Sequence, residues 1–255
     1  MKISFEKQPG DASYAISFFW KITLETESPT VVTDHFIPEL FYDYFFIKEG
    51  KIKCLDKTLK SKFDLPQQVL KSIHAHPLIF VFSTPLILYG ARLSLNFAES
   101  FWEEMPMNTF LNQTWLKNNP EDLDEFARQV TNCLAMRKTR KLPCPMLSMD
   151  FGESDWLASY SPRHKRRLYK TVFGMSRKEL QNIRNVHSFL EQTCNFASEN
   201  PRIIHYLNPD VFYDQPHLNH IFKKMTGFSP VEYIEASSVL QDNLMSASYN
   251  EVSSP

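Results

Sequence analysis

The chain has 255 residues, which is enough for two domains of ordinary size. Hydrophobic residues make up 43% of the sequence and aromatic residues 14%, so a sizeable core can form. The formal net charge of −1 excludes a uniformly basic nucleic-acid-binding protein, and any surface that binds DNA must be a local basic patch.

The sequence predicts a soluble protein of the cytoplasm. The N-terminus, "MKISFEKQPGDAS", lacks the apolar core of a signal peptide. The most apolar stretch, residues 77–91, is interrupted by polar residues and is too short to span a bilayer. No Cys-x-x-Cys pair occurs among the four cysteines, which fits a reducing compartment. These cysteines are Cys54, Cys133, Cys144 and Cys194.

The first hundred residues favour β-strands. "FIPELFYDYFFI" (36–47) is dense in aromatic residues, and "LIFVF" (78–82) and "LILYGARLSL" (86–95) are short apolar runs separated by proline. Residues 119–136 predict a helix with Asn119 as its N-cap and Pro120 at its first position. The basic, proline-containing stretch 137–145 reads as a linker.

The C-terminal half contains an internal repeat with an offset of 53 residues. "SPRHKRRLYKTVFGMSRKEL" (161–180) aligns with "DQPHLNHIFKKMTGFSPVEY" (214–233). Each copy reads as an N-cap, a helix of about 12 residues, a glycine that ends it in the left-handed conformation, and a serine that caps the next helix. Two helix-turn-helix modules follow from this pattern, joined by a longer helix over 177–192. The alternative is that any two amphipathic helices ending in glycine would align in this way.

The two copies differ in the face that they leave exposed. In the second copy, the buried stripe consists of Leu218, Ile221, Phe222 and Met225. Its other face carries Gln215, Asn219 and Lys223, with His220 beside them. Glutamine and asparagine can pair with an adenine edge, and lysine can contact phosphate or guanine. A solvated polar face is the alternative interpretation.

The first copy is strongly basic. Residues 161–190 contain eight lysines and arginines and one acid, Glu179, which gives a local charge of +7. Arg163, Arg166 and Arg167 follow the spacing of one helix face. This is the pattern expected of a surface that binds a phosphate backbone, although a solvated run of charges would also produce it.

The repeat resembles the DNA-binding domain of the AraC/XylS-type bacterial transcription regulators. "FYDQPHLNHIFKKMTGFSPVEYI" (212–234) is similar to the second helix-turn-helix signature of that family, and "SPRHKRRLYKTVFGMSRKEL" is similar to the first. The resemblance covers roughly residues 150–236. It implies that two recognition helices enter successive major grooves on one face of double-stranded DNA, about 34 Å apart.

The resemblance also implies which residues contact DNA. The base-reading positions of the family fall on Arg163, Arg166 and Arg167 in the first copy, and on Gln215, Asn219 and His220 in the second. The expected phosphate contacts are Lys170, Lys223 and Lys224.

The N-terminal half resembles, more distantly, the β-rich domain found on one branch of the same family. The matching positions are Pro38 and Asp43 in "IPELFYDYFF", and Gly90 and Arg92 in "YGARLSL". Such a domain is expected to sense a small-molecule effector or to form a homodimer, and Tyr42, Tyr44 and Arg92 are the candidate ligand contacts. RNA polymerase is a further expected partner, and no cofactor is expected.

These observations predict a multi-domain fold. Residues 1–140 are expected to form an α+β domain with a β-barrel-like, cupin-like sheet. Residues 150–237 are expected to form an all-α domain with two helix-turn-helix units, and residues 238–255 a flexible tail.

Departures from the family pattern motivate a second hypothesis. Lys165 and Val211 stand where the family has leucine and glycine, Leu207 replaces a small alanine, and Pro209 lies in the helix before the second copy. The alternative is therefore a degenerate relative whose helical domain binds a protein partner without specific DNA binding.

An enzyme has little support in the sequence. His74 and His76 could face one way on a strand and bind a metal ion, but no third ligand is spaced to join them, and two surface histidines are the simpler interpretation. Asp34, His35 and Glu39 cluster without a known motif. No phosphate-binding glycine loop and no Gly-x-Ser-x-Gly signature occurs. The chain is therefore predicted to be no enzyme, and a metal-dependent barrel enzyme is the third hypothesis.

Overall fold

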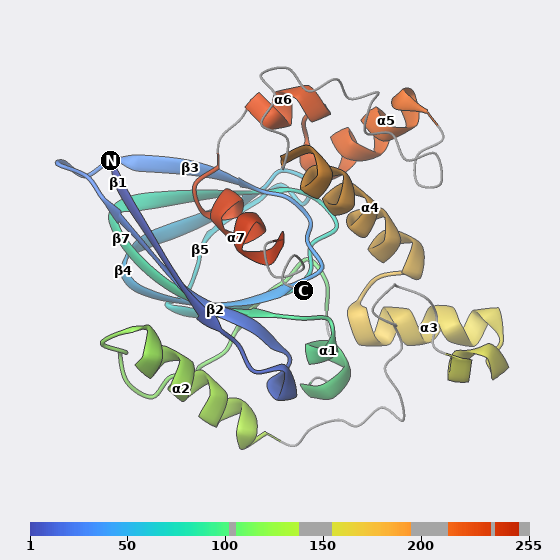
Figure 1. Ribbon diagram of the computed structural model, residues 1–255, viewed down its shortest axis with the longest axis horizontal. Coiled ribbons are helices and arrows are strands. Elements are labelled where there is room, and N and C mark those ends of the chain that lie inside the picture. The colour runs from blue at the N-terminus through green and yellow to red at the C-terminus, as the bar shows by residue number, and fades with distance from the viewer. Residues whose placement is uncertain (102–105, 138–154, 195–213, 236–237, 250–255) are drawn as a thin grey trace.

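The computed structural model describes residues 1–101, 106–137, 155–194, 214–235 and 238–249. A large antiparallel sheet occupies one side of the molecule and the helices between residues 162 and 235 occupy the other (Figure 1). The strands are β1 (Lys2–Pro9), β2 (Ile16–Glu25), β3 (Val31–Phe36), β4 (Tyr42–Asp56), β5 (Ser61–Asp64), β6 (Gln68–Lys71), β7 (Leu78–Leu93) and β8 (Phe110–Asn112). The helices are α1 (Asn96–Phe101), α2 (Leu123–Ala135), α3 (Pro162–Phe173), α4 (Arg177–Cys194), α5 (Gln215–Thr226), α6 (Pro230–Glu235) and α7 (Leu240–Tyr249), with 3₁₀ turns at Ala12–Tyr14 and Asp155–Ser159.

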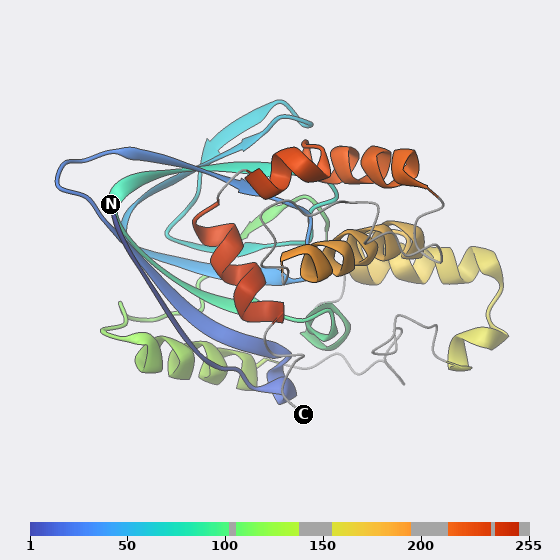
Figure 2. The ribbon, with the colours of Figure 1, turned by 45° about the horizontal axis from the view of Figure 1, so that its top comes forward.

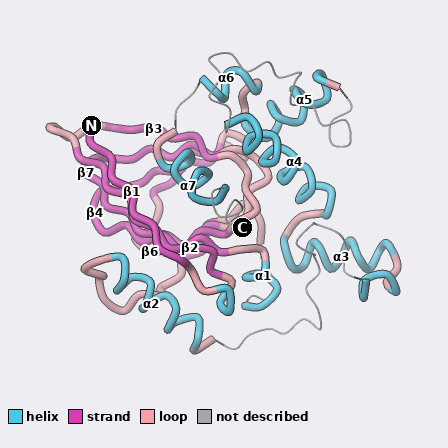
Figure 3. The backbone as a smooth tube through the Cα atoms, in the orientation of Figure 1, coloured by secondary structure: helices cyan, strands magenta, loops and turns pink. Residues whose placement is uncertain are grey.

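The sheet is built around its two longest strands, β4 and β7. Its order is β1-β2-β7-β4-β6-β8, all antiparallel, and β5 pairs with the end of β4. The first half of β7 pairs with β3 and the second half with β2, so the two runs expected at 78–82 and 86–95 form one strand. The run 36–47 is instead divided between β3 and β4, with Pro38 in the connection. The sheet is strongly curved (Figure 3), which agrees with a barrel-like shape.

Each face of the sheet carries its own apolar cluster. Phe18, Trp20, Phe45 and Phe80 lie on one face with residues of α7. The other face, which includes Phe19, packs against α1 and α2.

A glycine in β7 makes room for Trp20, the largest side chain in the apolar cluster on the α7 face. Trp20 lies directly opposite Gly90 in the register, and a Cβ added at Gly90 would overlap the Trp20 indole. Gly90 is therefore required by the close approach of this ring.

Two predicted boundaries are wrong. The helix expected from Asn119 begins at Leu123, because the Asp122 carboxylate accepts the Glu125 N–H at 2.8 Å and is the N-cap. Residues 240–249 of the expected flexible tail form α7, in which Leu240 and Leu244 are buried against the sheet. Polar and small residues separate the few apolar residues of this segment, so its apolar stripe is weak. The predicted linker lies mainly outside the described residues.

The helical half and the sheet share a continuous core. The apolar cluster on the α1–α2 face continues into Tyr169 of α3, Leu190 of α4 and Phe222 of α5. α7 then crosses back over the opposite face of the sheet, so that the C-terminal half contacts both sides of it (Figures 1 and 2). None of the described helices is both long enough and apolar enough to cross a membrane.

Candidate nucleic-acid interface

The two copies of the repeat have the same local structure. α3 and α5 each contain 12 residues and have proline in the first turn. Ser161 Oγ accepts the His164 N–H at 3.3 Å, and Asp214 Oδ1 accepts the His217 N–H at 2.8 Å. These are the N-caps expected from the sequence.

The helix ends also match. Gly174 (φ 73°) ends α3 and Gly227 (φ 83°) ends α5, and both occupy the left-handed region that glycine adopts without strain. The serine two residues later begins a reciprocal capping box in each copy. Glu179 accepts the Ser176 N–H at 2.7 Å, and Glu232 accepts the Ser229 N–H at 2.7 Å. The offset of 53 residues therefore extends from sequence to hydrogen bonds.

The helix expected before the second copy, residues 201–210, lies outside the described residues, and so does the expected start of the first unit at residues 150–154. Leu207, Pro209 and Val211 lie outside them as well. The helix-turn-helix units thus remain a prediction, whereas their second helices and caps are observed.

The buried faces of α3 and α5 fix their orientation. Tyr169, Val172 and Phe173 are buried on α3. Leu218, Phe222 and Met225 are buried on α5 as predicted, with Ile221 half-buried. Phe222 packs edge-on against Phe189 of α4 and Tyr233 of α6, with ring centroids 5.7 and 5.6 Å apart.

The exposed face of α3 carries the predicted arginines. Arg163, Arg166 and Arg167 are all exposed, and Arg167 Nη2 lies 3.1 Å from His164 Nδ1. Lys165 is half-buried at the position where the family has leucine. An open cleft of about 390 Å³ lies between α3 and the start of α4. It is lined by Pro162, Lys165, Arg166, Tyr169 and Arg177, so that three of its five lining residues are cationic.

The exposed face of α5 carries the predicted residues, but Asn219 is less exposed than expected. Gln215, His220, Lys223 and Lys224 are exposed. Asn219 is half-buried, and its Oδ1 is shielded from solvent without a hydrogen-bond partner in the part of the chain that the structure describes. The prediction that Asn219 lies on an open edge is therefore only partly correct, because the side-chain oxygen turns toward the protein.

One predicted phosphate contact of the first copy has an ion-pair partner. Lys170 Nζ lies 3.2 Å from Glu179 Oε2, the oxygen that also accepts from Ser176. Burial acts to raise the pKa of Glu179, but the hydrogen bonds from Ser176 and the Lys170 ammonium outweigh it and lower this pKa. The pair is exposed and contributes at most about 1 kcal/mol, so Lys170 can exchange Glu179 for a phosphate.

The predicted ligand contacts of the N-terminal domain do not converge on one site. Arg92 points to the face of the sheet that α7 covers, whereas Tyr42 and Tyr44 belong to the cluster on the opposite face. All three side chains are fully buried. Tyr44 stacks on Trp115 with ring centroids 4.2 Å apart, and its hydroxyl donates to Gln68 at 2.5 Å. These residues belong to the core.

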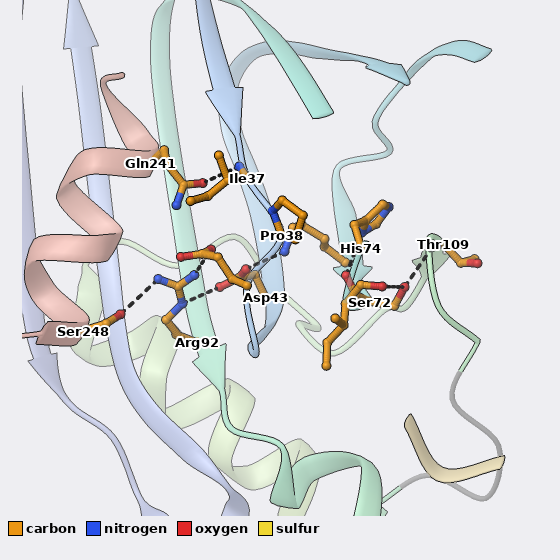
Figure 4. Close-up of polar contacts among 12 residues, drawn as sticks. Ile37, Pro38, Asp43, Ser72, His74, Arg92, Thr109, Gln241 and Ser248 are labelled. Carbon is orange, nitrogen blue, oxygen red and sulfur yellow. Dashed lines mark hydrogen bonds and ion pairs between the residues drawn. The ribbon is translucent and has the colours of Figure 1, made fainter. Parts of the chain in front are cut away.

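Arg92 is instead the centre of a buried charge cluster that joins the sheet to α7 (Figure 4). Its Nε donates to Asp43 Oδ1 at 3.2 Å, its Nη2 pairs with Glu39, and its Nη1 donates to Ser248 Oγ of α7 at 3.1 Å. Lys71 Nζ lies 3.0 Å from the other Asp43 oxygen. Burial acts to raise the pKa of Asp43, but the two cations outweigh it and hold this pKa below its ordinary value.

α4 and α7 are tied to the sheet by further hydrogen bonds that the sequence did not indicate. His187 Nε2 donates to the Pro38 carbonyl at 2.6 Å, and Asp34 Oδ2 accepts the Leu240 N–H at 2.5 Å at the start of α7. Gln241 Oε1 accepts the Ile37 N–H at 3.3 Å (Figure 4). These pairs are far apart in the chain, so no local pattern could reveal them.

The histidine pair is buried, and the expectation of two surface histidines is wrong. His74 donates from Nδ1 to the Ser72 carbonyl at 2.8 Å, and burial, aided by the Lys71 ammonium, lowers its pKa to about 3. His76 Nε2 lies 2.6 Å from Asp56 Oδ2. Within the described residues, no group of three or more His, Cys, Asp or Glu residues could hold a metal ion.

No family model matches the sequence, and no curated protein matches it significantly. The chain has a distant structural similarity to solved structures of ToxT from Vibrio cholerae. ToxT bound to (E)-4-(8-methylnaphthalen-1-yl)but-3-enoic acid is 12% identical, with a TM-score of 0.43 over 82% of this chain and 99% of that chain. ToxT from strain O395 is 11% identical, with a TM-score of 0.40 over 82% and 98%. ToxT with a bound unsaturated fatty acid is 12% identical, with a TM-score of 0.38 over 82% and 95%. These TM-scores are low, and the likeness alone carries no conclusion about function.

Proposed function

We propose that the chain is a transcription regulator that binds double-stranded DNA with α3 and α5 as its recognition helices. The observation that carries the proposal is the repeated frame of caps, glycine and capping box, whose first copy exposes three arginines on one helix face. Within this proposal Arg163, Arg166 and Arg167 read bases in one major groove, and Gln215, Asn219 and His220 read bases in the next. Lys170, Lys223 and Lys224 contact phosphates.

The sheet domain has a regulatory role in this proposal. The buried cluster around Arg92 and the His187–Pro38 hydrogen bond connect the sheet to α7 and α4. α4 joins the two copies, so a change in the sheet that moves α4 or α7 changes the placement of the recognition helices. A small-molecule effector, a homodimer and contact with RNA polymerase are expectations that follow from the family resemblance.

The alternative is a protein-interaction module, with which the neutrality of the second copy is compatible. Residues 214–233 contain two lysines and two acids, so their net charge is zero. A helix that binds only a protein partner needs no positive field.

A DNA-binding assay separates the two functions. Binding of the full chain to a labelled duplex from its own promoter region is measured across a range of salt concentrations. For the wild type, log K of binding is expected to fall linearly with log salt concentration, with a slope of about −0.9 for each phosphate contact. Arg166→Ala/Arg167→Ala is expected to lower affinity at least about tenfold, because each arginine contact to a base is worth about 1–3 kcal/mol.

The matched control is Lys117→Ala/Arg128→Ala, which removes two exposed cations outside the helical half. It is expected to bind like the wild type. If the wild type shows no salt-dependent DNA binding, the proposed function fails and the protein-interaction module takes its place.

A further inference from the structure

The hairpin between β4 and β5 presents three lysines to solvent. Lys57, Lys60 and Lys62 are exposed, and none of them has an ion-pair partner in the described part of the chain. The two acids of the hairpin are already engaged. Asp56 bonds to His76, and Asp64 lies 3.9 Å from Lys53. The positive charge at this hairpin is therefore not neutralised locally.

The turn of the hairpin is held in one conformation. Asp56 Oδ1 accepts the N–H groups of Thr58 and Leu59, both at 2.9 Å. Asp56 Oδ2 lies 2.6 Å from Nε2 of the buried His76. An aspartate that holds two successive turn N–H groups makes an Asx-type turn. The lysines of the turn thus project from a fixed loop.

The same anchor places the hairpin beside the second copy of the repeat. Pro77, which follows His76, lies 3.8 Å from the position that a Cβ would take at Gly227, the residue that ends α5. The His35 ring packs edge-on against Phe228, with centroids 5.1 Å apart. Burial lowers the pKa of His35, and the Lys57 ammonium adds to this shift, so Lys57 lies near the same contact. Figure 2 shows the hairpin, in cyan, at the same edge of the molecule as α5 and α6.

The second copy carries less positive charge than the first, since two lysines of α5 are balanced by Asp214 and Glu232 on either side of it. Its net charge is zero, whereas residues 161–180 carry seven cations and one acid, a net charge of +6. α5 is about 18 Å long at 1.5 Å per residue, and the major groove is about 12 Å wide. When α5 lies in a groove, its C-terminal end reaches the flanking backbone, which is where the hairpin lies.

We propose that Lys57, Lys60 and Lys62 bind the DNA phosphate backbone that flanks the groove of α5. The proposal rests on the proposed function and adds a contact from the N-terminal domain. The hairpin adds positive charge to that of Lys223 and Lys224 and makes the position of the sheet relative to α5 part of DNA binding.

The test measures the salt dependence of binding to a labelled duplex of mixed sequence. Phosphate contacts do not depend on sequence, so this probe needs no known operator. Lys57→Gln/Lys60→Gln/Lys62→Gln is compared with Lys2→Gln/Lys117→Gln/Arg128→Gln, which removes the same charge from exposed positions elsewhere. Thermal melting establishes that both variants fold like the wild type.

The hairpin variant is expected to show a slope of log K against log salt that is shallower by about one for each lost contact, and so by up to about three. The control is expected to keep the wild-type slope. Equal slopes for the two variants overturn the proposal while leaving the proposed function intact. A hairpin variant that keeps the wild-type slope but no longer pellets with phosphatidylserine vesicles assigns the lysines to a lipid surface and overturns it as well. A wild type that binds no DNA overturns both.

Discussion

The two copies of the repeat share a frame and differ in almost everything displayed on it. N-cap, proline, glycine and capping box recur 53 residues apart with the same hydrogen bonds. The net charge, in contrast, falls from +6 in residues 161–180 to zero in residues 214–233. Local backbone structure and surface chemistry therefore vary independently in this chain. The caps preserve the helix, and the outward positions are free to acquire different partners.

The copies also differ in their supports. α3 contacts α1, and the first copy is connected to the sheet through α4, where His187 binds Pro38. The second copy lies directly on the sheet through Phe228 and His35, and the chain then returns to the sheet as α7. The second copy is thus more directly coupled to the N-terminal domain.

The largest expected effect is the loss of stability when the central aromatic side chain of one copy is truncated. Phe222→Ala is expected to lower the free energy of unfolding by about 3–5 kcal/mol, because the ring is fully buried between α4 and α6. The equivalent change in the first copy is Tyr169→Ala, at the aligned position. Urea denaturation measures both. Lys224→Ala, on the exposed face of α5, is the control and is expected to change stability by less than about 0.5 kcal/mol. A cost for Phe222→Ala as small as that of the control would contradict the packing described.

A smaller effect tests whether the two frames are equivalent. Gly174→Ala and Gly227→Ala are each expected to cost about 1–2 kcal/mol, because both positions have positive φ. At Gly227 the nearest atom to an added Cβ is Pro77 Cγ at 3.8 Å, an ordinary contact, so the cost there comes from the backbone. Gly227→Asn is the matched control and should recover part of the loss, since asparagine tolerates the left-handed region. If thermal melting shows no loss of stability for either alanine variant, the two glycines do not need the left-handed conformation described.

The smallest effect is a pH dependence of stability that compares two junctions between the helical half and the N-terminal domain. The first junction is the His187–Pro38 hydrogen bond, and the second is the His35–Phe228 contact. Burial lowers the pKa of His187 from its ordinary 6.5, with Glu39 opposing and Arg92 assisting the shift. Because the unfolded chain then binds more protons, stability is full above pH 6.5 and falls as the pH drops toward the lowered value, by up to about 1.4 kcal/mol per pH unit. His187→Gln should flatten this slope between pH 7.5 and 5.5.

His35 provides the comparison for the second junction. Its pKa is also lowered by burial, but less protein surrounds its ring than that of His187, so His35→Gln should flatten the slope less than His187→Gln. Urea denaturation at several pH values measures both variants. The reverse order would mean that the second junction, and not α4, is the more sensitive to acid.

The sequence predicted the repeat well because its signals are local. In the first copy an N-cap (Ser161), a C-terminal glycine (Gly174) and the N-cap of the next helix (Ser176) lie within about one helix length. The second copy has the same order at Asp214, Gly227 and Ser229. The buried stripe of α5 follows from spacing alone. The charge of the first copy is equally visible, since it depends on composition.

The contacts between the sheet and helices α4 and α7 could not be predicted, because the residues that pair there are remote in the chain. Nothing near Arg92 indicates that it bonds to Ser248, and a short polar segment after residue 237 gives a weak apolar signal for α7. The burial of His74 and His76 could not be predicted for the same reason, since it is set by neighbours remote in the chain such as Phe110.

The return of α7 to the sheet has a consequence for synthesis on the ribosome. Lys7 of β1 donates to the Ala247 carbonyl of α7, 240 residues further along the chain. At about 5–20 residues per second, β1 leaves the ribosome about 10–50 s before its partner exists. Once the sheet has formed, the face that Leu240 and Leu244 later cover stays exposed to water and to other chains until α7 has been made. Nascent chains of this protein should therefore depend on chaperones until α7 has been made.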